Sequence, residues 1–152
     1  MKNISSNIIS NSKNYKYYWH SLFIEFYQLK IMKTILIVDD LKSELDLMAN
    51  YLTNAGYKII MATNGEEAIA KTIENQPDAI VTDWMMPKMG GLDICRKLKK
   101  NPETADIPVI ACTAKNRDVD RLWAKKQGVK GYVTKPCTQE QLVSALQEAI
   151  NS

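Results

Sequence analysis

Five polar side chains each stand at or just beyond the end of a short apolar run. They are the carboxylates of Asp39, Asp40 and Asp83, the hydroxyl of Thr113 and the ammonium of Lys135. A carboxylate can attack phosphorus when nearby cations neutralise the approach of like charges. Carboxylate oxygens also bind hard divalent cations, and a lysine supplies a compact positive charge. These residue types therefore indicate phosphoryl transfer to an aspartate, provided that the fold brings them together.

The runs themselves have the composition of strands in a parallel sheet. They are Ile35–Val38, Asp78–Asp83, Ile107–Ala111 and Gly131–Val133. Their apolar residues do not alternate with polar ones, which is typical of strands that are buried on both faces. Lys58–Ala62 is predicted to add a fifth strand.

Segments with helical periodicity separate the strands. Leu41, Leu45, Met48 and Leu52 form one apolar stripe in a helix predicted over 41–55, with Gly56 as its stop. Further helices are predicted from the N-cap Asn64 to before Pro77, over 91–100, over 116–127, and from Thr138, where Gln141 completes a capping box. The last helix is expected to turn Leu142, Ala145, Leu146 and Ala149 inward. Alternating strands and helices predict a doubly wound α/β fold whose ligand site lies at the carboxyl ends of the strands.

Residues 33–150 resemble the receiver domains of two-component response regulators. The resemblance depends on Asp39-Asp40, on Asp83 followed by Met85-Met86-Pro87-Lys88-Met89-Gly90-Gly91, on Thr113-Ala114, and on Tyr132 before Lys135-Pro136. It implies a five-stranded parallel sheet in the flavodoxin-like order 2-1-3-4-5, with helices on both faces, and a cis peptide between Lys135 and Pro136. The chain reaches Ser152 without a helix-turn-helix or catalytic segment, so a stand-alone receiver is expected.

The resemblance also assigns roles to the polar residues. Asp83 is the expected phosphoacceptor, assisted by Lys135 and Thr113, while Thr113 and Tyr132 form the expected switch. A Mg²⁺ or Mn²⁺ ion is expected on Asp39, Asp40, Asp83 and the backbone carbonyl of Met85. Charge supports a metal, since three carboxylates at one edge repel one another and Lys135 offsets only one of them.

The expected protein is a signalling phosphoacceptor with slow autodephosphorylation chemistry. A histidine kinase or a histidine phosphotransfer domain is the expected donor, and a motility or signalling protein the expected recipient of the signal. Residues 118–128 resemble the fourth helix of stand-alone receivers in chemotaxis-like systems that control type IV pilus motility and phototaxis. The resemblance implies an output face made by the fourth helix, the last strand and the last helix, and Trp123 is expected beside it. Three alternative functions stay open, namely a flagellar-motor receiver, a phosphorelay intermediate and a phosphorylation-independent scaffold. A metabolic phosphohydrolase is disfavoured, because Met85 stands where a second catalytic acid is needed.

Composition and charge narrow the range of partners and of cellular compartments. The net charge of +3 comes entirely from residues 1–31, and residues 32–152 carry 16 basic and 16 acidic side chains, which gives no electrostatic case for nucleic acid. Cys95, Cys112 and Cys137 are too few and too scattered for a disulfide framework or a metal knuckle, so a cytoplasmic protein is expected. Cys137 stands where most receivers have a large aromatic residue, so packing or the partner surface is expected to differ there. A redox role is a minor alternative.

Residues 1–31 fall outside the receiver pattern, which is expected to occupy 32–152. Residues 1–14 are rich in Asn, Ser and Lys and are predicted to be disordered. Residues 15–31 hold seven of the twelve aromatic side chains and are predicted to form an amphipathic helix that docks on the domain or on a membrane surface, without stable insertion. The favoured alternative is that translation begins at Met32 and that residues 1–31 are an upstream extension.

Overall fold

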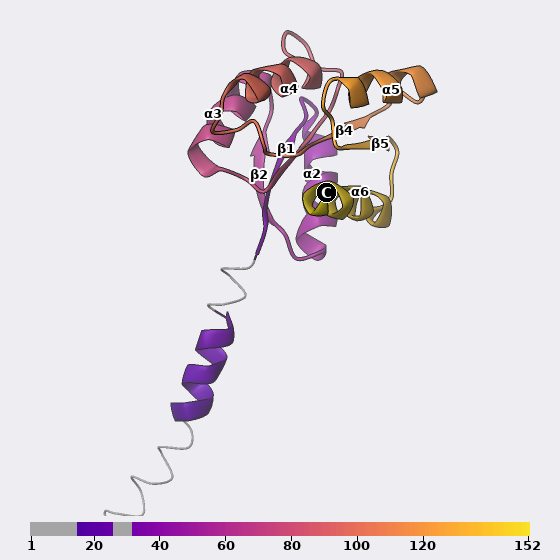
Figure 1. Cartoon of the computed structure of the whole chain (residues 1–152). Coiled ribbons are helices and arrows are strands. Elements are labelled where there is room, and N and C mark those ends of the chain that lie inside the picture. Colours follow the sequence, from indigo (N-terminus) through magenta and orange to yellow (C-terminus); the bar gives the residue numbers. More distant parts are fainter. Residues whose placement is uncertain (1–14, 26–31) are drawn as a thin grey trace, which may run out of the picture. The chain divides into compact units, whose positions relative to one another are not determined.

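The computed structural model describes residues 15–25 and 32–152, which belong to two separate units of the chain. In the second unit five parallel strands alternate with five helices (Figure 1). The strands are β1 (Thr34–Val38), β2 (Lys58–Ala62), β3 (Ala79–Thr82), β4 (Val109–Thr113) and β5 (Gly131–Thr134). The helices are α2 (Lys42–Asn54), α3 (Gly65–Asn75), α4 (Gly91–Lys100), α5 (Asp118–Lys126) and α6 (Gln139–Asn151). The predicted α/β class is confirmed.

The strand order is β2-β1-β3-β4-β5, as the resemblance implied. The central strands β1 and β3 pair in register, with Leu36 opposite Ile80 and Val38 opposite Thr82. Their residues are buried almost throughout, which explains why neither strand shows an alternating pattern. Because the strands are parallel, the residues that follow β1, β3, β4 and β5 emerge at one edge of the sheet.

Helices cover both faces of the sheet (Figure 1). Helices α2 and α6 lie on one face, where Met48 and Leu142 belong to the same core cluster. Helices α3, α4 and α5 lie on the other face, where Ile94 of α4 and Ala124 of α5 join a second cluster. Two separate apolar cores thus hold the sheet between them and fix the positions of the strand ends.

The predicted helix boundaries hold at several caps. The Asn64 side chain accepts a hydrogen bond from the Glu67 N–H, and Thr138 and Gln141 form the full capping box. Helices α2 and α5 are followed by Gly56 at φ 91° and Gly128 at φ 92°, a left-handed conformation that glycine adopts without steric cost. The Lys135–Pro136 peptide is cis, as the resemblance implied.

Two local predictions are wrong. The fourth strand begins at Val109 rather than at Ile107 and runs to Thr113, because Pro108 has no N–H for the strand ladder. Leu41 is 56 % exposed instead of joining the inward stripe, since it is the N-cap that precedes α2. In α6, Leu142, Leu146 and Ala149 are buried as predicted, and Ala145 is partly buried.

Residues 15–25 form a helix in the first unit. Its described aromatic side chains are largely exposed within that unit, among them Tyr17 and Trp19. Residues 1–14, for which disorder is predicted, lie outside the described residues, as do the aromatic residues Phe26 and Tyr27. Across 15–25 and 32–152, none of the helices combines the length and apolar character needed to cross a membrane.

Candidate functional site

Three carboxylates meet at the edge formed by the ends of β1 and β3. Ligand oxygens of Asp39, Asp40 and Asp83 all lie within 4.8 Å of one another. Asp39 is completely buried, Asp83 is nearly so, and Asp40 is exposed. The structure therefore brings together the three acids that the sequence singled out, with one of them open to solvent.

Backbone hydrogen bonds orient two of these acids. The Asp83 N–H donates to the Val38 carbonyl at 2.9 Å, which ties the end of β3 to the end of β1. Asp39 Oδ1 accepts from the Leu41 N–H at 3.0 Å, and Asp83 Oδ1 accepts from the Met85 N–H at 3.0 Å. Each carboxylate thus keeps its second oxygen for other partners. Met85 lies in the loop after β3, beside Asp83, where its carbonyl stays a predicted metal ligand.

Lys135 places its ammonium among these second oxygens. Its Nζ donates to Oδ2 of Asp39 and lies 3.3 Å from Oδ2 of Asp83. Burial acts to lower the Lys135 pKa, but the hydrogen bond to Asp39 and the charge of Asp83 outweigh it and raise that pKa above its ordinary value. Lys135 is therefore a fixed positive charge at any physiological pH.

A fourth carboxylate escaped the sequence reasoning. Glu44, in the first turn of α2, places Oε2 3.4 Å from Lys135 Nζ. The sequence held a signal for this, because Glu44 lies in the first turn of the helix that starts directly after Asp39-Asp40, close to the same strand edge. Three carboxylates thus contact one ammonium, and the fourth, Asp40, lies beside Asp39 and Asp83, so the cluster has a surplus of negative charge.

The donor set at this edge fits a hard divalent cation. Mg²⁺ prefers carboxylate, carbonyl and water oxygens, and it usually keeps several waters. The closely spaced oxygens of Asp39, Asp40 and Asp83 meet that preference, and the exposed Asp40 leaves room for water. An acidic triad of this kind is typical of the Mg²⁺ site of receiver domains.

Two glycines allow the loop after β3 to close over Asp83. A Cβ on Gly90 would lie 2.7 Å from the Trp84 carbonyl oxygen, and a Cβ on Gly91 would lie 2.8 Å from that of Asp83. Backbone atoms cannot yield at such distances without moving the loop. The pair Gly90-Gly91 therefore permits the close approach that holds Asp83 and Met85 in place.

The two predicted switch residues sit on neighbouring strands. Thr113 is fully buried at the end of β4, and its carbonyl accepts a 2.9 Å hydrogen bond from the Lys135 N–H. Tyr132 is half-buried in β5, and its hydroxyl donates to the Lys115 carbonyl at 3.0 Å. One backbone bond therefore ties the end of β4 to the residue that follows β5, and the Tyr132 hydroxyl ties the β4–α5 loop to β5.

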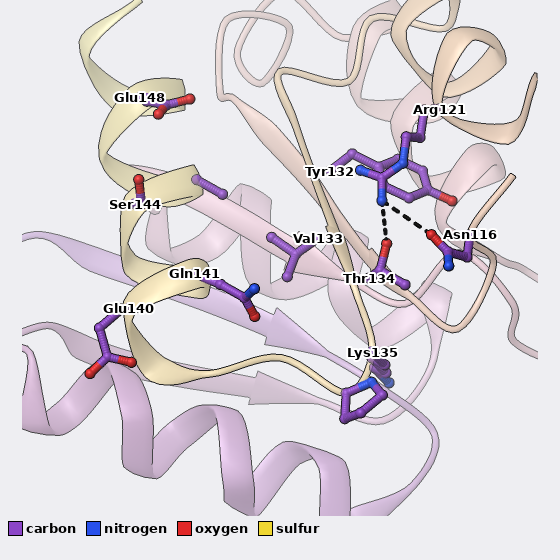
Figure 2. Close-up of a pocket in the computed structure, with 12 residues that line it drawn as sticks. Asn116, Arg121, Tyr132, Val133, Thr134, Lys135, Glu140, Gln141, Ser144 and Glu148 are labelled. Atoms are coloured by element: carbon purple, nitrogen blue, oxygen red, sulfur yellow. Dashed lines mark hydrogen bonds between the residues drawn. The ribbon is translucent and has the colours of Figure 1, made fainter. Parts of the chain in front are cut away.

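Arg121 of α5 is a further contact of Tyr132 that the sequence reasoning did not identify. Its guanidinium carbon lies 5.0 Å from the centre of the Tyr132 ring, within the range of a cation–π interaction. The same side chain donates to Thr134 Oγ1 at 2.7 Å and to Asn116 Oδ1 at 3.4 Å, as Figure 2 shows. Arg121 thus connects α5, β5 and the β4–α5 loop.

Two open clefts border these residues. One of about 640 Å³ is lined by Asp83, Thr113, Ala114 and Lys135, and also by Glu44 of the acidic cluster. The other, of about 740 Å³, lies on the face made by α5, β5 and α6 and is drawn in Figure 2. The second is larger, but the chemistry belongs to the first, because only that cleft contains Asp83.

Comparison with known proteins identifies this arrangement. Residues 35–147 match the family model of the response regulator receiver domain. Protein PilH of Pseudomonas aeruginosa is 36% identical over 115 residues, which are 76% of this chain and 95% of PilH. The phosphate regulon transcriptional regulatory protein PhoB of the same organism is 37% identical, but the chain spans only 52% of its length.

Solved structures give the same likeness. The chemotaxis protein CheY4 of Vibrio cholerae superimposes with a TM-score of 0.73 at 29% identity, covering 78% of this chain and 98% of CheY4. A response regulator described as putative, from Chloroflexus aurantiacus, gives a TM-score of 0.76 at 28% identity, covering 80% of this chain and 99% of that one.

Proposed function

The chain belongs to the response regulator receiver family, and from this premise we propose that Asp83 accepts a phosphoryl group and thereby controls the binding of a partner protein. Receiver domains are signalling phosphoacceptors, and membership implies a histidine kinase as donor. The proposal concerns the acceptor residue, the residues that assist phosphoryl transfer, and the partner protein.

One observation carries the proposal: Lys135 bridges Asp39 and Asp83 inside a cluster with surplus negative charge. The Met85 N–H holds Oδ1 of Asp83, and Lys135 approaches Oδ2, so the carboxylate is oriented toward the cleft. In the proposed step an Asp83 oxygen attacks phosphorus, the bond from phosphorus to the donor nitrogen breaks, and the imidazole leaves. Lys135 then pairs with a phosphoryl oxygen, which is a favourable charge-assisted contact.

The proposed metal site consists of Asp39, Asp40, Asp83 and the Met85 carbonyl, and its ion is Mg²⁺ or Mn²⁺. When bound, the ion supplies charge neutralisation for the approach of the phosphoryl group. Asp39 and Asp83 are already held by backbone N–H groups, so little reorganisation of these side chains is needed.

The proposed switch uses Thr113 and Tyr132. A phosphoryl group on Asp83 offers oxygens that the Thr113 hydroxyl can reach by a shift of the β4–α5 loop, since both residues line one cleft. Such a shift moves the Lys115 carbonyl and frees the Tyr132 hydroxyl that bonds to it. Phosphorylation therefore biases two arrangements of the loop, and the partner reads the resulting face of α5, β5 and α6.

For the output we propose a protein of pilus-based motility. The α5 segment with Trp123 resembles receivers of that group, and the likeness to PilH extends over nearly all of PilH. A phosphorelay role, in which Asp83 passes the phosphoryl group to a histidine phosphotransfer domain, is the main competitor. A scaffold that never accepts phosphate is disfavoured, because it has no use for the surplus charge around Lys135.

The decisive experiment is incubation with acetyl phosphate and Mg²⁺ followed by intact-mass measurement. We expect wild type to gain the mass of one phosphoryl group and Asp83→Asn to gain none. Asp106→Asn is the matched control, since Asp106 is an exposed aspartate outside the cleft, and it should behave as wild type does. Labelling of Asp83→Asn to the wild-type level would show that another residue is the acceptor.

A further inference from the structure

Two of the three cysteines lie against each other beside the acidic site. Cys112, the fourth residue of β4, is only 1% exposed and belongs to the core cluster under α2 and α6. Cys137, in the loop between β5 and α6, is partly exposed and packs against the same cluster. Each thiol is the strongest single influence on the pKa of the other, as expected of two neighbouring sulfur atoms. Cys95 is buried in the other cluster, on the opposite face of the sheet.

Strand register explains why residues 25 positions apart meet. Cys112 is paired with Val133, and Thr113 with Thr134. The chain stays against β4 as far as Lys135, whose N–H bonds to the Thr113 carbonyl at 2.9 Å. Cys137 follows two residues later. Neighbouring residues of a strand point to opposite faces, so Cys112 meets Cys137 on the α2 and α6 side while Thr113 points away from it.

The environment makes the two thiols unequal. Interaction with the Cys112 thiol lowers the pKa of Cys137 to about 7, burial opposes this change, and the Lys135 ammonium assists it, while the Glu44 carboxylate acts against it. The same interaction, together with burial, raises the pKa of Cys112. Cys137 is therefore the half-exposed, thiolate-prone partner, and Cys112 is the protonated, buried one. The thiolate is the form that reacts with oxidants.

We propose that Cys112 and Cys137 form a redox-responsive dithiol, which a hydroperoxide converts into an intramolecular disulfide at the end of β4. The half-exposed Cys137 sulfur attacks the peroxide oxygen, the O–O bond breaks, and Cys137 becomes a sulfenic acid as the peroxide is reduced to water or an alcohol. The Cys112 sulfur then attacks the Cys137 sulfur, the S–O bond breaks, and water leaves with the thiol proton. Two thiols are oxidised by two electrons, and one peroxide is reduced.

The disulfide has a consequence that rests on the proposed phosphoryl function. It would join the residue before Thr113 to the loop that follows Lys135-Pro136, and so restrain both groups that must adjust to a phosphoryl group on Asp83. We expect the oxidised protein to accept a phosphoryl group from acetyl phosphate more slowly, by about threefold or more, as for other steps that need a loop movement. Reduction should restore the rate.

The test uses the full chain, treated with hydrogen peroxide, unfolded without reductant, alkylated with iodoacetamide and weighed intact. The untreated protein should take three alkyl groups, and the oxidised protein one, with dithiothreitol restoring three. Peptide mapping should show Cys112 linked to Cys137 and the alkyl group on Cys95. Three alkyl groups after oxidation, a sulfinic acid on Cys137, or a link to Cys95 or to a second chain would overturn the proposal.

Two variants separate the outcomes. Cys95→Ala keeps the pair and should change from two alkyl groups to none on oxidation, whereas Cys137→Ser should keep two under both conditions. Phosphoryl gain is then compared in oxidised and reduced wild type. Equal rates in the two forms would refute the coupling to the switch. No gain in the reduced protein would refute the proposed function, and the alkyl count would still decide the dithiol.

Discussion

Replacing Asp40 by asparagine should reverse the order of stability between wild type and variant when Mg²⁺ is added. Asp40 is the exposed member of the acidic triad, and its oxygen lies within 4.8 Å of those of Asp39 and Asp83. At that separation two like charges in water repel by about 0.9 kcal/mol, and physiological salt roughly halves this value. Two neighbours make about 1 kcal/mol, which the attraction to Lys135 reduces. Without metal, Asp40→Asn should therefore be more stable than wild type by about 0.5–1 kcal/mol.

Magnesium should act in the opposite direction. A ligand that binds only the folded state at ten times its Kd stabilises it by about 1.4 kcal/mol. Wild type should gain this amount, while Asp40→Asn, which lacks one of the proposed ligands, should gain little at the same concentration. Wild type then becomes the more stable protein. This reversal of the order of stability is informative, because a variant that merely damages the fold would be less stable than wild type both with and without Mg²⁺.

Urea unfolding in chelator and in Mg²⁺ measures both free energies. The buried Trp84 next to Asp83 reports by fluorescence, and far-ultraviolet circular dichroism checks that the whole domain unfolds in the same transition. Asp106→Asn is the control, because it removes one exposed carboxylate outside the triad and should change neither the stability nor the response to Mg²⁺. The reasoning is refuted if Asp40→Asn is destabilised in chelator, or if Mg²⁺ stabilises it as much as wild type.

Three further outcomes are expected. Tyr132→Phe removes the 3.0 Å hydrogen bond to the Lys115 carbonyl and should lower the free energy of unfolding by about 0.5–1.5 kcal/mol in urea titrations, and an unchanged value would mean that this bond adds nothing to the resting state. Contact with Lys71 lowers the pKa of Glu67 from 4.5 to about 2, so its stabilising effect is present above pH 4.5 and is lost as the pH falls toward 2. Glu67→Gln should therefore be less stable than wild type at pH 7, by at most about 1 kcal/mol for a surface pair, and urea midpoints should converge as the pH falls from 4.5 to about 2. A chain that begins at Met32 should gain the phosphoryl group from acetyl phosphate at the wild-type rate, because no proposed site residue precedes Asp39, and a slower gain would show that residues 1–31 support the domain.

Most of the fold could be predicted from the sequence, because each strand and helix is marked by residues close together in the chain. Residues 35–38 and 79–81 are continuous apolar runs, which are typical of strands buried on both faces of a parallel sheet. Helix ends could also be predicted where a side chain caps the helix through a hydrogen bond, as Thr138 does at the start of α6. Where a boundary depends on tertiary pairing the prediction was wrong, since β4 runs to Thr113 rather than to Ala111. Leu41 was placed on the wrong side because periodicity does not mark where a helix begins.

Only part of the site could be predicted from the sequence, and there is a physical reason for this. The acids at the ends of β1 and β3 could be grouped because parallel strands share one edge. The contacts of Glu44 and Arg121 depend instead on which way a helix is turned about its own axis, and a sequence stripe gives this only roughly. The pairing of Cys112 with Cys137 requires the register of β4 against β5, together with the path of the chain after Lys135.

The route from Asp83 to the partner face is short enough that the proposed switch needs no extended network. Thr113, the last residue of β4, lines the Asp83 cleft, and Lys115, which bonds to Tyr132, is only two residues further along the chain. Tyr132 packs against the second apolar core, and its polar contacts are one neutral hydrogen bond and one exposed cation–π contact with Arg121, together worth about 1–2.5 kcal/mol. A hundredfold shift between two states requires about 2.7 kcal/mol of differential interaction. A phosphoryl group with charge-assisted bonds to Lys135 and Thr113 is of that scale, so it can reverse the preference between the two arrangements of the loop.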